Sequence, residues 1–136
     1  TQYPKAKVIW CHLAQMRFQN RNTIYGPDYV RKLIEKHPNL YFDLYSGPPD
    51  HIYPASMEYP GKYWDRSTGK LKPEWAKLIA DYPWRFMIAL DLNPFIMRAF
   101  SNKVRMQRAV LDSLPESARE IVAYKAAWKL LFNEDI

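Results

Sequence analysis

The first indication of the fold lies in the segment Arg85-Phe86-Met87-Ile88-Ala89-Leu90-Asp91-Leu92-Asn93-Pro94. An apolar run, residues 86–90, ends abruptly at Asp91. A continuous apolar run of this length is typical of a parallel strand that is buried on both faces. In folds with parallel strands, ligands and reactive groups gather at the carboxyl ends of the strands. Asp91 is therefore the first candidate for a functional residue.

Two earlier apolar runs have the same form and also end at an ionisable side chain. Residues 8–11 end at His12, and residues 40–42 end at Asp43. The carboxyl ends of parallel strands meet at the same edge of a sheet. We therefore expect His12, Asp43 and Asp91 to form one row.

Helical patterns separate these runs. Residues 27–36 and 73–82 each begin with a proline in the first turn and carry apolar residues at helical spacing. The order strand, helix, strand, helix, strand predicts parallel strands that are joined by right-handed crossovers. We expect a single α/β domain that covers residues 1–136.

The segments around the third strand are less regular. Residues 50–71 are rich in Tyr, Pro and Gly and show no clear period, which predicts a long loop. Asn102 is expected to cap the helix that follows the third strand. In the last helix, Trp128, Leu131 and Phe132 are expected to form an apolar stripe against the core.

Composition limits the classes of function. Basic residues exceed acidic ones, 20 against 14, which gives a net charge of +6. They are spread along the chain, which makes nucleic-acid binding the weakest functional hypothesis. The single cysteine, Cys11, allows no intramolecular disulfide, and no signal peptide is visible, so we expect a cytoplasmic protein. No apolar stretch approaches the roughly 18 residues that a membrane span needs.

Four segments carry a resemblance to a known family. They are Val8-Ile9-Trp10-Cys11-His12-Leu13, His37-Pro38-Asn39-Leu40-Tyr41-Phe42-Asp43-Leu44, Tyr82-Pro83-Trp84-Arg85-Phe86-Met87-Ile88-Ala89-Leu90-Asp91, and Ala118-Arg119-Glu120-Ile121-Val122-Ala123-Tyr124-Lys125-Ala126-Ala127-Trp128-Lys129-Leu130-Leu131. In this order and spacing, they resemble the metal-dependent TIM-barrel hydrolases of the amidohydrolase superfamily. The relevant branch includes the aminocarboxymuconate semialdehyde decarboxylases and the pyrone-dicarboxylate lactonases. The resemblance implies the C-terminal part of a (β/α)8 barrel, with strands six to eight and the closing helices.

The resemblance also implies roles for individual residues. His12 matches the histidine at the end of strand six, which acts in catalysis or binds metal. Asp91 matches the aspartate at the end of strand eight, which ligates metal, acts as general base, or both. Asp43 matches the frequent aspartate of strand seven and is a candidate for substrate binding as well as for a structural contact. The implied cofactor is a divalent metal, zinc or alternatively manganese, and a metal-free parent enzyme stays open.

Two further residues complete the candidate substrate-binding set. Arg98 follows the tip of the third strand and can orient a carboxylate or phosphate. His51 lies in the long loop, where it faces either solvent or substrate. The implied substrate of the parent enzyme is a small molecule that carries a carboxylate and is hydrolysed or decarboxylated.

The sequence also departs from the family. It contains no counterpart of the strand-one His-x-His pair or of strands one to five, and Ala89, Leu90 and Ala126 replace residues that are usual there. These departures support an alternative function, a non-catalytic scaffold or interaction module derived from the same fold. Three strands leave sheet edges uncovered. We therefore expect the isolated chain to be inactive and to assemble with itself or with a missing N-terminal barrel segment.

Overall fold

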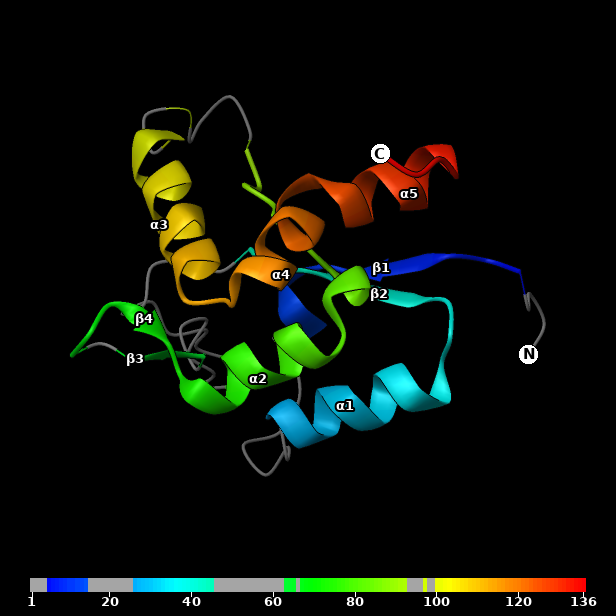
Figure 1. Cartoon of the computed structure of the whole chain (residues 1–136), viewed down its shortest axis with the longest axis horizontal. Helices are drawn as coiled ribbons and strands as arrows, with labels where there is room; N and C mark the ends of the chain where they lie inside the picture. The colour runs from blue at the N-terminus through cyan, green and yellow to red at the C-terminus, as the bar shows by residue number, and fades with distance from the viewer. Residues whose placement is uncertain (1–4, 15–25, 46–62, 66, 93–96, 98–99) are drawn as a thin grey trace.

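The computed structural model describes residues 5–14, 26–45, 63–65, 67–92, 97 and 100–136. These residues form an α/β domain in which helices pack along one side of a sheet of three parallel strands (Figure 1). The predicted α/β class with parallel strands is therefore confirmed. The three strands make an open sheet, and the eight-stranded barrel stays a prediction.

The middle strand of the sheet is β2 (Leu40–Asp43). It pairs in parallel with β1 (Val8–Trp10) on one side and with β5 (Phe86–Met87) on the other. Each strand comes from one of the three apolar runs of the sequence. β5 is shorter than the predicted strand 86–90: its two residues are buried, whereas residues 88–90 lie outside the strand and are half-buried. Val8 of the border strand β1 is 51% exposed.

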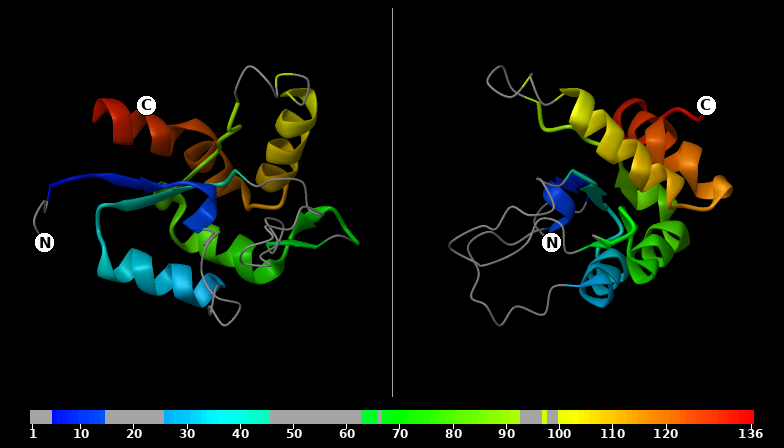
Figure 2. Two further views of the ribbon diagram at one scale, coloured as in Figure 1. Left: turned by 180° about the vertical axis from the view of Figure 1, so that it is seen from behind. Right: turned by 90° about the vertical axis from the view of Figure 1, so that its left-hand side faces the viewer.

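The first two long helices begin at the prolines that the sequence marks, and they are α1 (Pro27–Lys36) and α2 (Pro73–Asp81). In the view of Figure 1 they lie together below the strands, and α5 lies above them. When the molecule is turned by 90°, the helices follow one another in an arc around one side of the sheet (Figure 2). An ion pair joins the first two helices, because Arg31 Nη2 lies 2.8 Å from Asp81 Oδ2. Their buried faces carry Val30, Ile34, Trp75, Leu78 and Ile79.

In the described residues from 100 to the end of the chain, four helical segments follow the sheet, and two of them, η4 and α5, pack on β5. They are α3 (Phe100–Asp112), α4 (Glu116–Glu120), the π-helix η4 (Ile121–Lys125) and α5 (Ala126–Phe132). The last three run on from one another and bury residues at a uniform spacing of four, namely Ala118, Val122, Ala126 and Leu130. None of the helices in the described part of the chain has the length and apolarity that crossing a membrane requires.

Two sequence predictions for these helices are wrong. Asn102 lies inside α3, where its Oδ1 accepts a hydrogen bond of 2.7 Å from Arg105, so it does not cap the helix. Trp128, Leu131 and Phe132 are exposed, and Leu131 is 68% exposed. The π-helical turn is wider than an α-helical one. In α5 the residues that face the core are Ala126 and Leu130, which continue the spacing of four that runs through this turn.

A short hairpin occupies the end of the segment that was predicted to be a loop. Strand β3 (Trp64–Asp65) pairs in antiparallel fashion with β4 (Lys70–Leu71). The turn places Gly69 at φ 67°, a left-handed conformation that glycine adopts without a steric penalty. Tyr63 and Trp64 are buried, as expected for aromatic residues that pack on the domain. Residues 46–62 lie outside the described residues.

The centre of the core lies between β2 and β5. The rings of Phe42 and Phe86 stack with a centroid distance of 5.6 Å and an interplanar angle of 27°, and both side chains are fully buried. Stacked aromatic pairs add to the stabilisation that comes from burying their surface. This pair therefore fixes the two strands to each other on the face that the helices cover.

We expect Phe86→Ala to lower the free energy of unfolding by about 3–5 kcal/mol, because it leaves a cavity against Phe42. Leu131→Ala is the control, since it removes an exposed side chain of α5, and we expect a change within about 0.5 kcal/mol. Urea denaturation followed by circular dichroism measures both values. Equal losses in the two variants would contradict the described core.

Candidate functional site

The carboxyl ends of the three parallel strands come together in the structure. His12 follows β1, Asp43 ends β2, and Asp91 follows β5. His12 Nε2 lies 3.9 Å from Asp91 Oδ2, although the two residues come from opposite borders of the sheet. The backbone N–H of His12 donates a hydrogen bond of 2.7 Å to Asp43 Oδ1. The row that the sequence predicts is therefore present as a cluster of three side chains.

Asp43 holds the backbone of this cluster. Its Oδ1 accepts hydrogen bonds from the N–H groups of His12, at 2.7 Å, and of Tyr45, at 3.2 Å. A carboxylate that accepts two backbone hydrogen bonds fixes the turns that leave the strands. This contact is the structural one considered for Asp43, and its candidate role in substrate binding stays a prediction.

The backbone of the cluster adopts strained conformations. His12, Leu13 and Asp91 have φ angles of 59°, 54° and 44°, in the left-handed region that residues other than glycine rarely occupy. Each such conformation costs on the order of 1–3 kcal/mol and persists only where the surroundings enforce it. The complete burial of Leu13 supplies one such constraint beside His12. Strain of this kind concentrates at functional sites, which supports His12 and Asp91 as the candidates.

A lysine and a tyrosine complete the cluster. Lys103, a buried residue of α3, donates hydrogen bonds from Nζ to the carbonyl oxygens of Leu90 and Asp91, both at 2.8 Å, and to the Tyr45 hydroxyl at 3.0 Å. The Tyr45 ring meets the His12 ring edge-on, with centroids 5.0 Å apart. Lys103 therefore holds the backbone of Asp91 and the ring that contacts His12.

Sequence reasoning placed neither Tyr45 nor Lys103 in the site. Lys103 appears in the sequence as one of several basic residues that follow the third strand, and those usually form a solvated helix face. Helical spacing was the signal that could have placed Lys103 on the buried side of α3. Lys103, Gln107 and Val110 recur on one face of this helix, and all three are buried.

Cys11 lies beside the same carboxylates. Desolvation raises the pKa of its thiol first, and a hydrogen bond to Asp43 and the charges of Asp43 and Asp91 raise it further. The side chain is exposed. Because the thiolate is the reactive form of cysteine, a raised pKa keeps this thiol less reactive near neutral pH.

The cluster is suited to moving a proton. Asp91 is half exposed and His12 is partly buried, so a small molecule can approach the pair from solvent. An imidazole beside a carboxylate is a common arrangement for general acid–base catalysis. His12 can therefore accept or donate a proton while Asp91 orients it.

The described residues alone do not make a zinc site. Such sites use at least three protein ligands. No group of three or more His, Cys, Asp or Glu side chains that could hold a metal occurs among the residues that the structure describes. The His12–Asp91 pair supplies two donors. Arg98 and His51 lie outside the described residues.

The pKa of Cys11 offers a test of the cluster. We expect its alkylation by iodoacetamide to require a higher pH than that of a free cysteine peptide, because the raised pKa displaces the rate profile upward. Asp43→Asn removes the hydrogen bond to Cys11 and the charge of Asp43, so we expect the midpoint of the alkylation profile to move to lower pH. Asp91→Asn removes only the charge of Asp91, which contributes least to the raised pKa, so we expect a smaller shift of the midpoint. Asp65→Asn in the β3–β4 turn is the control, and a midpoint that ignores both cluster variants would contradict the geometry.

Lys103→Met tests the support of the cluster from α3. It leaves the carbonyl groups of Leu90 and Asp91 without the ammonium group, so we expect the free energy of unfolding to fall by about 1–3 kcal/mol. Arg105→Met is a matched change on the exposed face of the same helix, with an expected effect within about 0.5 kcal/mol. Thermal and urea denaturation measure the difference, and equal effects would show that the buried contacts of Lys103 do not matter.

A scan against models of protein families, a search of curated proteins and a search of solved structures each find no match to this chain. The resemblance to the amidohydrolase superfamily therefore stays a prediction from the sequence.

Proposed function

We propose that this chain is the C-terminal part of an amidohydrolase-type (β/α)8 barrel whose reaction uses His12 and Asp91. The single observation that carries the proposal is the 3.9 Å separation of these two side chains across the middle strand. In the family that the sequence resembles, strands six, seven and eight are neighbours. The order β1-β2-β5 agrees with that arrangement.

The proposed substrate is a small molecule that carries a carboxylate. His12 exchanges a proton with the substrate or with water, and Asp91 orients the imidazole and stabilises its charged form. Lys103 acts as a positioning residue, because its ammonium group donates to the backbone carbonyl of Asp91 and not to a substrate. Arg98 stays the proposed partner of the substrate carboxylate, by its place in the sequence after Asp91.

The proposed reaction uses a divalent metal only if further ligands for it come from outside the described residues. In the family, strand-one histidines supply them, and this sequence has no such pair. A further barrel segment or a second copy of the chain is the proposed source. The exposure of Val8 and Ile9 on the border strand β1 supports such an assembly, because uncovered apolar border strands favour pairing with another chain.

A non-catalytic scaffold is the second candidate. It is favoured by the absence of a three-ligand group among the described residues and by Ala89, Leu90 and Ala126 in place of the usual family residues. In that case the strained strand ends are a remnant of an active ancestor.

Metal analysis of the purified chain distinguishes the two candidates. If the enzyme proposal holds, the size-exclusion peak contains near-stoichiometric zinc or manganese, and both His12→Gln and Asp91→Asn lose it. Asn tolerates the left-handed backbone of residue 91, so Asp91→Asn removes the charge without adding strain.

His37→Gln is the control, because His37 lies at the end of α1, away from the strand-end cluster. If the purified chain contains no metal, or if both cluster variants retain it, the metal-dependent enzyme is rejected and the scaffold is favoured.

A further inference from the structure

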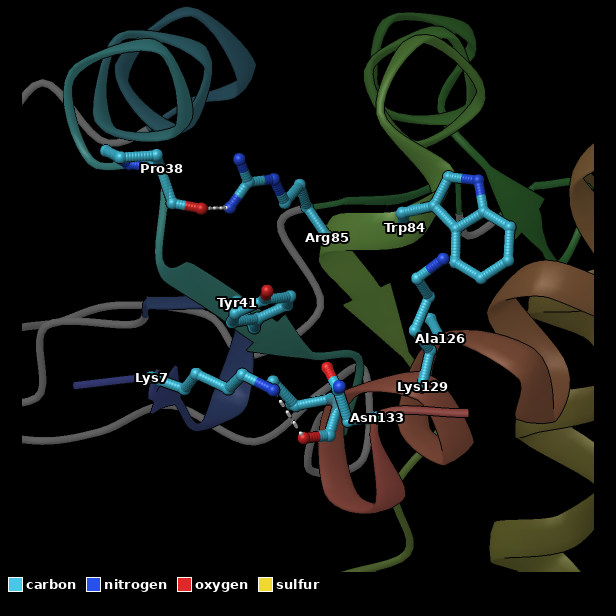
Figure 3. A pocket seen from close by; sticks show the side chains of 9 residues that line it. Lys7, Pro38, Tyr41, Trp84, Arg85, Ala126, Lys129 and Asn133 are labelled. Atoms are coloured by element: carbon cyan, nitrogen blue, oxygen red, sulfur yellow. Dashed lines mark hydrogen bonds between the residues drawn. The ribbon is translucent and has the colours of Figure 1, made fainter. Parts of the chain in front are cut away.

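Figure 3 shows a pocket of about 390 Å³ between the sheet and α5. It lies at the amino ends of the strands, whereas the His12–Asp91 pair lies at their carboxyl ends. The segments that precede the strands build it. Lys7 comes directly before β1, Tyr41 lies near the start of β2, and Trp84 and Arg85 come from the short helix η2 (Pro83–Arg85) before β5. Lys129 of α5 closes another side. The pocket is therefore separate from the candidate active site.

The pocket is positively charged. Lys7, Arg85 and Lys129 line it, and the described residues that line it include no Asp or Glu. Lys7 Nζ donates a hydrogen bond of 3.1 Å to the carbonyl oxygen of Leu130. Arg85 donates to the carbonyl oxygens of Pro38 and Leu40. These acceptors are neutral, so they position the two cations without cancelling their charge.

Lys129 differs from the other two cations in having an acidic partner. Its Nζ bonds to Asp135 near the end of the chain. Asp135 is not among the residues that line this pocket. Lys129 is therefore held at the rim by a carboxylate with which a ligand must compete.

Two aromatic rings accompany the cations. Arg85 lies over the Tyr41 ring and Lys129 over the Trp84 ring, each 5.3 Å from the ring centroid. Cation–π contacts of this kind keep charged groups beside a flat apolar surface. Trp84 is 41% exposed, so part of its ring is open to a ligand from solvent. The pocket thus offers stacking surface and positive charge together.

We propose that this pocket binds a small organic anion in which a planar ring carries a phosphate or carboxylate group. The volume lies within the usual range of small-molecule sites, roughly 300–1,000 Å³. A bare phosphate ion would fill only a small part of it. The ring stacks on Trp84 and Tyr41, and the oxyanion meets Lys7, Arg85 and Lys129. The proposal does not depend on the function of the strand-end cluster.

Calorimetric titration of the full chain tests this proposal with four probes. AMP carries a ring with a phosphate, 1-naphthoate carries a ring with a carboxylate, adenosine is a ring compound without charge, and inorganic phosphate is an anion without a ring. We expect AMP or 1-naphthoate to bind one per chain with a Kd of about 1 mM or below, and adenosine and inorganic phosphate to bind at least about tenfold more weakly. A comparison of 1-naphthoate with 1-naphthyl phosphate, which share the same ring, then identifies the preferred oxyanion.

Single-residue variants test whether the anionic ring compound binds in this pocket. Lys7→Gln and Lys129→Gln are each expected to weaken it about three- to tenfold, since each removes a charge-assisted contact. Asp135→Asn is expected to strengthen it, because it releases Lys129. Lys77→Gln is the matched control, since Lys77 is also an exposed lysine paired with an aspartate, Asp81, but does not line the pocket.

Circular dichroism verifies that each variant is folded. Three results would overturn the proposal: no binding of either anionic ring compound, equal binding of adenosine, or binding that Lys7→Gln and Lys129→Gln leave unchanged.

Discussion

The structure depends on the parallel pairing of β2 with strands on both of its sides. β2 is the only described strand with two neighbours in the sheet, so β1 and β5 meet only through it. Its Phe42 stacks on Phe86 within the core. At its carboxyl end, Asp43 binds the backbone of His12, which belongs to the segment after β1. Packing and electrostatics therefore act along the same strand.

This pairing explains why a strained strand-end cluster persists. Left-handed backbone at His12, Leu13 and Asp91 is unfavourable by itself. The carboxylate of Asp43 holds one side, and the ammonium group of Lys103 holds the other through the carbonyl of Asp91. Buried charged groups are tolerated only when their hydrogen bonds are satisfied. The three oxygen partners of Lys103 meet this condition.

The two ends of the sheet have different chemistry. At the carboxyl ends, one imidazole and two carboxylates gather, which suits proton transfer. At the amino ends, three cations and two aromatic rings surround a pocket, which suits the binding of an anion. The net charge of +6 is spread along the sequence, but the fold concentrates part of it at this second end.

The sequence by itself determined the positions of the three parallel strands, the first two long helices and the strand-end residues, but not the β3–β4 hairpin. Apolar runs that stop at His12, Asp43 and Asp91, and prolines that open α1 and α2, are local signals that survive folding. Only the tertiary structure decided that Lys103 and Tyr45 join the site, because the ammonium group of Lys103 reaches Asp91 from α3 and the Tyr45 ring reaches His12 from the end of a neighbouring strand. It also decided that Trp128 faces solvent. Helical periodicity tells which residues share a face, but the neighbouring elements determine which face is buried.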